Sequence, residues 1–178
     1  MKNTIANSLI IISINIMILY GIRKNNNFVN ISMIIRDHFK IFDGAKKHII
    51  VLYIIPIMTA IGIALLYNFS ISMIEAIMVV ISVVISALLS FQGGILNVES
   101  KSKDSKYRDI LSETNASINF TVLINIFLVF IMLIYIGLAN NILKIIFSSI
   151  IVYFLMITFL TILIIIKRIR ILFKNYSD

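Results

Sequence analysis

The chain has no cysteine, and its 178 residues include only one proline, six glycines and two histidines. Without cysteine it can form neither disulfides nor thiolate metal sites, and it lacks a cysteine nucleophile. The sequence also lacks a glycine-rich phosphate loop, a nucleophile motif and a carboxylate pair at catalytic spacing. His38 and His48 do not stand at the spacing of zinc ligands, so we expect both to be surface histidines at a membrane boundary. The sequence therefore predicts a non-enzymatic protein that carries no metal and no cofactor.

Acidic residues are also scarce, since eight Asp and Glu stand against sixteen Lys and Arg and give a net charge of +8. Nucleic-acid binding is one explanation of such basicity, but the basic residues are scattered through short segments and are not gathered on one face. Their distribution favours membrane orientation and attraction to anionic lipids. We therefore expect the lipid bilayer as a partner and no direct contact with nucleic acid.

Hydrophobic residues make up 60% of the chain, and the mean hydropathy is +1.04, whereas a soluble domain is about 45–50% apolar. A soluble core of this length cannot bury so much Ile and Leu, so the bilayer must act as solvent. The predicted fold class is an all-α integral membrane protein, a single domain over residues 1–178 built as a bundle of four to five transmembrane helices. The predicted spans are the long, almost uncharged runs at 4–22, 49–67, 71–96, 120–138 and 145–166.

Residues 28–42 predict an amphipathic helix that is too short and too charged to cross a bilayer. We expect it to lie on the cytoplasmic surface, with its Lys and Arg side chains among lipid headgroups. The alternative is a helix that docks on a partner protein. The candidates for contact with lipid or a partner, in this helix and in other connecting segments, are Arg36, Lys40, Lys46, Lys47, Lys106 and Arg108.

The basic residues also indicate how the chain is oriented. All but Lys2 and Lys144 of the sixteen fall in segments 23–48 and 97–119 and in the tail after the last span, and short cytoplasmic loops carry such an excess. Five spans then place the amino terminus outside and the carboxyl terminus in the cytoplasm. If 4–22 does not cross, four spans place both termini inside. Heavy use of Ile, Asn and Lys is typical of an AT-rich bacterial gene, so we expect a bacterial source.

Local signals refine the connections between the spans. Pro56 predicts a kink in the second span, with the freed carbonyl satisfied by a neighbour. Ala60 and Ala64 form a small-xxx-small pair that lets helices approach closely. Residues 68–70 leave room only for a tight turn, so the second and third spans are expected to form a hairpin. Segment 97–119 predicts a solvated loop up to about Tyr107, followed by a short helix that runs into the next span.

The third span carries Glu75, the only charge well inside any long hydrophobic run. At about 100° per residue, Glu75, Ser82, Ser86 and Ser90 fall on one stripe of the helix. One interpretation places Glu75 at headgroup level, hydrogen-bonded to Asn68 or Tyr67. The other makes the stripe the lining of a water-filled path or of an oligomer axis. Serines four residues apart are more often helix-packing contacts, so the stripe favours a homo-oligomer more than conduction.

The layout of uncharged spans, a charged cytosolic segment and the sequence RDILSETNASINF at residues 108–120 resembles small polytopic membrane proteins of bacterial phage-defence operons, among them the membrane subunit of the Kiwa system. The apparent fifth span departs from the four-helix plan of that subunit. The resemblance implies a homo-oligomeric inner-membrane component that recruits a cytosolic, nucleic-acid-acting partner during infection.

We therefore expect an inner-membrane component of a bacterial defence system that oligomerises and signals to a cytosolic partner protein through segments 23–48 and 97–119. The alternatives are a pore-forming or membrane-disrupting effector, a bacteriocin immunity protein and a transporter subunit. A transporter typically has more intramembrane polar residues and broken helices than one proline and one glutamate. A pore former leaks ions when expressed alone, whereas a sensor subunit is harmless without its partner.

Overall fold

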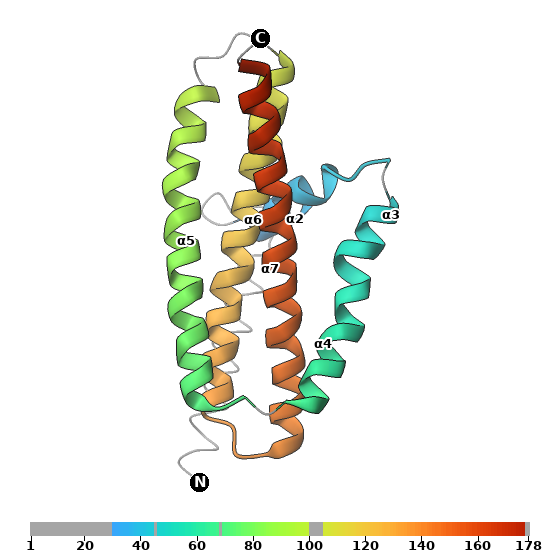
Figure 1. Ribbon diagram of the computed structural model, residues 1–178, viewed down its shortest axis with the longest axis vertical. Coiled ribbons are helices and arrows are strands. Elements are labelled where there is room, and N and C mark those ends of the chain that lie inside the picture. Colours follow the sequence, from blue (N-terminus) through green and yellow to red (C-terminus); the bar gives the residue numbers. More distant parts are fainter. Residues whose placement is uncertain (1–29, 45, 68, 100–104, 177–178) are drawn as a thin grey trace.

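The computed structural model describes residues 30–44, 46–67, 69–99 and 105–176 (Figure 1). The predicted first span at 4–22 lies outside these residues. Within them the regular secondary structure is entirely helical, which confirms the predicted all-α class. The helices are α2 (Ile31–Lys40), α3 (Lys46–Ile49), the π-helical turn η1 (Ile50–Ile54), α4 (Ile55–Leu66), α5 (Ile71–Glu99), α6 (Ser105–Ile136) and α7 (Asn141–Tyr176).

Four helical segments in the described part of the chain are long and apolar enough to cross a membrane. They overlap the predicted second to fifth spans and identify a multi-pass membrane protein. Side-chain hydroxyl and amide groups fix two of the helix starts, because Ser70 accepts a bond from the backbone of Met73 and Asn140 accepts one from Ile142. The four segments are Lys47–Leu66, Ile71–Asn97, Tyr107–Ile136 and Asn141–Ile171.

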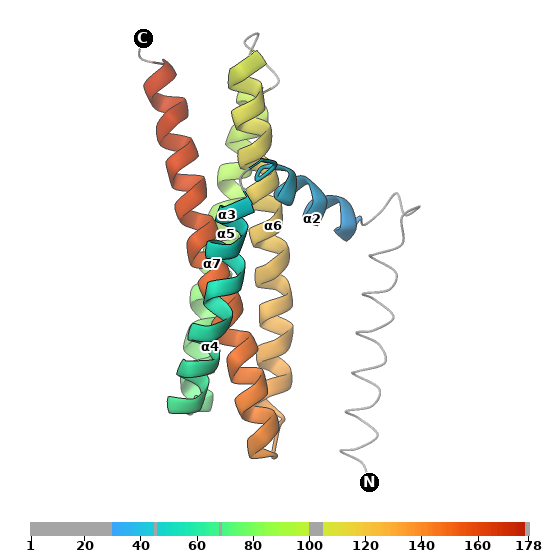
Figure 2. The ribbon, with the colours of Figure 1, turned by 90° about the vertical axis from the view of Figure 1, so that its right-hand side faces the viewer.

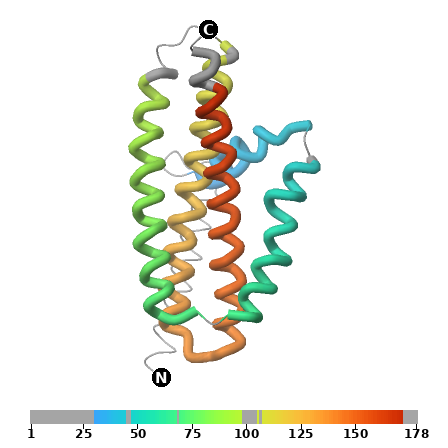
Figure 3. The backbone as a smooth tube through the Cα atoms, in the orientation of Figure 1, coloured from blue at the N-terminus to red at the C-terminus, as the bar shows by residue number. Residues whose placement is uncertain are grey.

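Helices α6 and α7 are longer than a bilayer core requires. Their 32 and 36 residues correspond to roughly 48 and 54 Å at 1.5 Å per residue, against a hydrocarbon core of about 30 Å. Figure 3 shows that α5 ends, α6 begins and α7 ends at the same end of the bundle. We call this the basic end, because Arg108, Lys167 and Arg170 are exposed there. In segment 97–119, α5 extends to Glu99 and α6 begins at Ser105 and runs unbroken into the span, so the predicted helix from about Tyr107 into the span is confirmed and begins two residues earlier.

Helix α6 is the centre of the bundle, with α5 and α7 packed against it and α4 packed against α7 (Figures 1 and 2). Helix α5 contributes a core residue at every seventh position, which is the spacing that keeps one helix face on its neighbour. Helices α4 and α5 do not pack on each other, so the expected hairpin is wrong as a packing unit, although the connection is short. The α5 core positions are Ile74, Ile81, Leu88 and Ile95.

The helix is irregular just before Pro56, where the sequence predicts a kink. Proline has no N–H group, and its ring crowds the carbonyl of the preceding turn. Here the preceding turn is the wider π-helical η1. The hydroxyl of Tyr153 on α7 donates to the carbonyl of Tyr53 in this turn, at 3.2 Å. Further along α4, Ala60 and Ala64 are buried where the helix packs on α7, which confirms the close approach expected from small residues.

Candidate functional site

Helix α2 lies across the long helices and rests on α6, as Figure 2 shows. Its first turn is capped by Asn30, whose side-chain oxygen accepts a hydrogen bond from the backbone of Met33 at 2.9 Å. The apolar side of α2 packs through Ile34 and Phe39 on a cluster around Phe120. Much of this apolar side is therefore covered by the protein itself, and the contact of the Lys and Arg side chains of α2 with lipid headgroups stays a prediction.

His38 lies in the middle of this contact, and its side chain is 0% exposed. Its ring is stacked on Phe120 of α6, with centroids 3.9 Å apart and planes 3° apart. Its Nε2 atom forms a hydrogen bond with the hydroxyl of Tyr53 in η1. The rings of Phe39 and Phe42 approach the imidazole edge-on. The prediction of a surface histidine is therefore wrong for His38, whereas His48 is exposed.

The environment of His38 keeps its imidazole neutral. Burial and, to a smaller extent, the nearby positive charge of Arg168 on α7 together lower the pKa of His38 to about 4. Its Nδ1 atom is buried and has no hydrogen-bond partner among the described residues. At neutral pH His38 thus acts as an aromatic side chain with one polar contact, and a proton on it would be an uncompensated buried charge.

Close to His38, α6 and α7 are joined by an ion pair between Glu113 and Arg168. The Arg168 side chain is 16% exposed and that of Glu113 is 45% exposed, so the pair lies at the edge of the packed region. The carboxylate offsets the charge that Arg168 brings to the site. The site therefore connects three elements to α6: α2 through His38, η1 through Tyr53 and α7 through Arg168.

Below the ion pair, small polar side chains of α6 face α7. The hydroxyl groups of most of them donate to carbonyls of their own helix, which leaves the two helices free to approach closely. One contact crosses between the helices, where Thr158 donates to the side-chain oxygen of Asn125 at 3.0 Å. The Asn125 Nδ2 atom is buried and has no partner among the described residues. The fully buried polar residues of α6 are Thr114, Ser117, Thr121 and Asn125.

A second polar contact joins α5 to α6 near the basic end. The Gln92 amide nitrogen donates to the side-chain oxygens of both Asn115 and Asn119, each at 2.8 Å. Both asparagines belong to the RDILSETNASINF segment, as do Glu113, Thr114, Ser117 and Phe120. Much of this segment therefore contacts other helices of the same chain, while Arg108, Asp109 and Ser112 remain exposed.

The predicted stripe of α5 lies outside the packed core. Glu75, Ser82, Ser86 and Ser90 are all exposed, on a side of α5 that does not pack on α6. The hydroxyls of Ser82 and Ser86 donate to carbonyls of their own helix at 2.9 Å. Glu75 makes no hydrogen bond or ion pair with any described residue, and Asn68, one of its two expected partners, is outside the described part. A role in packing between copies stays a prediction.

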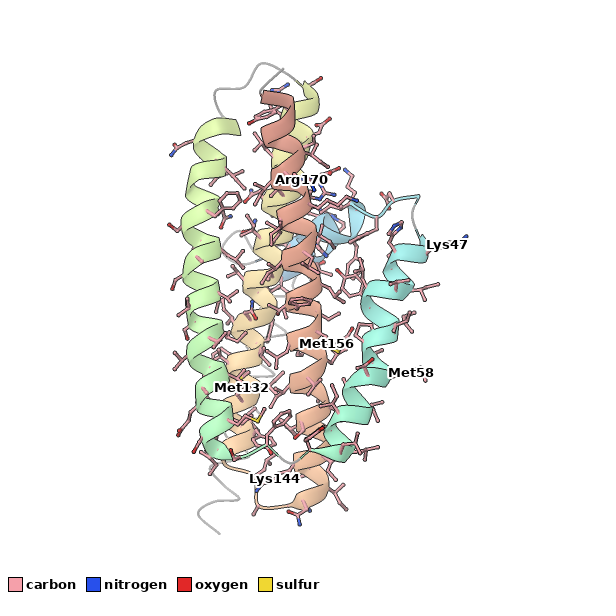
Figure 4. All side chains as sticks on the ribbon, viewed as in Figure 1. Lys47, Met58, Met132, Lys144, Met156 and Arg170 are labelled. Atoms are coloured by element: carbon pink, nitrogen blue, oxygen red, sulfur yellow. The ribbon has the colours of Figure 1, made fainter. Side chains whose placement is uncertain are left out.

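The predicted basic candidates come from separate elements. Arg36 and Lys40 are exposed on α2, Lys47 on α3 and Arg108 on α6, while nothing is described for the side chains of Lys46 and Lys106. Arg36 pairs with its neighbour Asp37 at 3.9 Å. Figure 4 shows Lys47 and Arg170 toward one end of the bundle and Lys144 at the other.

The residue that sequence reasoning missed is His38. Its position four residues after Ile34 and four before Phe42 places it on the apolar side of α2, and this spacing is the signal that could have found it. The described residues contain no group of three or more His, Cys, Asp or Glu able to hold a metal ion. Comparison of the chain with known protein families, with curated proteins and with solved structures found no match.

Proposed function

We propose that the chain is a non-enzymatic inner-membrane component that oligomerises and passes a signal between the bilayer and a cytosolic partner protein. The observation that carries this proposal is the continuity of α6 and α7, which run without a break from the membrane span to the basic end. The ion pair between Glu113 and Arg168 joins them there. Because unbroken helices are stiff, a displacement at one end is transmitted to the other.

The basic end is assigned to the cytoplasm by the positive-inside rule. It exposes Arg108 on α6 and Lys167 and Arg170 on α7, outside the predicted membrane core. Such a surface suits a partner with an acidic face, because complementary charge steers association. Helices α2 and α3 add Arg36, Lys40 and Lys47 beside it.

Oligomerisation is proposed on the α5 stripe. A charged side chain at the bilayer centre costs about 2.5–3.5 kcal/mol, and less toward the interface. Glu75 is the fifth residue of α5 and lies on a face that no other described helix covers. A second copy packed on this face removes the carboxylate from lipid and lets the small serines bring the two helices close together.

The setting in bacterial defence rests on the resemblance of residues 108–120 to membrane proteins of phage-defence operons. In this proposal Arg108, Asp109 and Ser112 are the residues of that segment that meet the partner, because they are exposed. Asn115 and Asn119 join α6 to α5, and Glu113 joins it to α7.

The test places a photo-crosslinking amino acid at Arg108 or Arg170 of the full chain, expressed with its neighbouring genes in the native host. We expect covalent adducts with one soluble protein from both positions and none from Lys144 at the opposite end, which is the matched control. We also expect phage plating to rise when Arg108 and Arg170 are both changed to Glu. Equal adducts from all three positions, or plating unaffected by the double reversal, would contradict the proposal.

A further inference from the structure

Helix α2 contacts two elements that belong to different helices. It packs on α6, and from the same face His38 forms a hydrogen bond with Tyr53 of η1, just before α4. We define the aromatic clamp as His38, Phe39, Phe42, Tyr53 and Phe120, whose rings are in mutual contact. The clamp joins α2 and η1 to Phe120 of α6, and η1 is also bonded to α7 through Tyr153.

Helix α2 depends on this docking for its own stability. It has 10 residues, and isolated helices shorter than about 12–15 residues are marginal in water. Its opposite face is exposed and bears Met33, Arg36 and Asp37. Gly44, in the connection to α3, has a φ of +85°, a conformation that glycine adopts without strain. The helix is therefore held by one face and attached to the rest of the chain by a permissive residue.

The other element that the clamp contacts is η1, a turn wider than the α-helix that follows it. In η1 the Ile55 N–H bonds to the carbonyl of Ile50, five residues back, and such wide turns are usually single insertions in an α-helix. Tyr53 of this turn is held at two atoms, by His38 at its hydroxyl and by Tyr153 at its carbonyl. Without His38 one of these two restraints is lost.

We propose that α2 can detach from the bundle. When it is docked through His38 of the aromatic clamp, it fixes the π-helical turn before α4. Its release lets the α3–η1 segment move relative to α6 and α7. This is a conformational device within the chain itself. Only the cause of release rests on the proposed function: a cytosolic partner binds the exposed face of α2 and pulls the helix away.

In the experiment, protonation of His38 is used to release α2. The charged groups near His38 are Arg168 on α7 and its partner Glu113 on α6, and the Tyr53 hydroxyl faces it from η1. On its own helix, Arg36 and Asp37 are exposed and pair with each other. Because the docked pKa is about 4 and the ordinary value is 6.5, docking is complete above about pH 6.5 and weakens as pH falls toward 4. The docking equilibrium then changes by on the order of a hundredfold.

The absence of cysteine from the sequence allows spin labels at two chosen positions in the full chain, purified in lipid nanodiscs. The pair Lys40→Cys and Arg108→Cys reports α2 against α6. The pair Lys47→Cys and Arg170→Cys reports the α3–η1 segment against α7, and all four positions are exposed. We expect one distance from each pair at about pH 7.5, and a second, longer distance from both pairs at about pH 4.

Three variants identify the responsible group. His38→Phe keeps a ring on Phe120 but cannot take up a proton, so both pairs should hold a single distance at either pH. His48→Phe, at the exposed histidine, is the matched control and should keep the full change in distances. Glu113→Gln should keep it as well, because we expect the change to depend on protonation of His38. A response that persists in His38→Phe, or a second α2 distance without one from the α3–η1 pair, overturns the proposal. No partner is present in this measurement, so its failure leaves the crosslinking result of the proposed function unaffected.

Discussion

The imidazole of His38 lies parallel to the ring of Phe120, with planes 3° apart and centroids separated by 3.9 Å. The two residues are 82 positions apart in the chain, and their contact joins α2 to the central helix α6. Both side chains are buried. Because the contact is flat and enclosed, either ring can be replaced only by one of similar shape without leaving a void.

The first prediction concerns Phe120. Phe120→Ala should lower the free energy of unfolding by about 3 kcal/mol, the usual cost of a buried Phe→Ala change, and should release α2. Thermal unfolding in a mild detergent measures this loss. Phe130→Ala on the same helix is the control, because Phe130 is 44% exposed to the lipid side and should cost little. Equal losses in the two variants would show that α2 does not depend on Phe120.

The second prediction is the pH dependence of stability. The pKa of His38 is lowered in the folded chain, so its contribution is present above about pH 6.5 and is lost as pH falls toward 4. The difference between the two pKa values corresponds to about 3 kcal/mol at most. The melting temperature of the native chain should therefore fall across this window more than that of His38→Phe. Parallel curves for the two proteins contradict the prediction.

The sequence predicted the second to fifth spans because each is a long apolar run. It predicted a kink at Pro56 because proline cannot complete the helical ladder, and the structure has a π-helical turn just before this residue. It did not predict what buries His38, because Tyr53 and Phe120 are 15 and 82 residues away, and the local spacing places His38 only on the apolar side of α2. Nor did it predict that α4 packs on α7 and not on α5. A helix that is apolar all round carries no stripe that identifies its neighbour.

The third prediction concerns the charge beside His38. Arg168 lowers the pKa of His38, so Arg168→Gln should raise the pH at which the docked His38 takes up its proton and should weaken the effect of acid on docking. Histidine titration followed by NMR on the full chain in nanodiscs measures the midpoint directly. Arg170→Gln is the matched control, because Arg170 is on the same helix but exposed. A downward shift in Arg168→Gln, or an equal shift in both variants, would mean that Arg168 does not act on His38.

The fourth prediction concerns the Asn125–Thr158 hydrogen bond between α6 and α7. Such bonds in membrane helices are worth about 0.6 kcal/mol on average, and the Asn125 Nδ2 atom already lacks a described partner. Thr158→Val leaves the whole amide unsatisfied and should cost about 1 kcal/mol. Asn125→Leu removes the polar group itself and should be nearly neutral, as should the double variant. Unfolding in detergent tests this order, and a larger loss from Asn125→Leu than from Thr158→Val would reverse it.

The fifth prediction tests the proposed oligomer. Glu75→Gln together with Ser86→Leu should reduce association without preventing membrane insertion. The first change removes the charge that a second copy would shield from lipid, and the second replaces a small side chain with a large one that keeps the two helices apart. Sedimentation in detergent gives the oligomer size, and extraction from membranes gives the inserted fraction. Val80→Leu is the control, since Val80 is 60% exposed on α5 but lies far around the helix from Glu75. If the double variant and Val80→Leu both keep the native size, the stripe faces lipid and the copies meet elsewhere. If the double variant alone falls to a smaller species, α5 is the interface, and the basic ends of the copies are held on one side of the membrane for a shared partner.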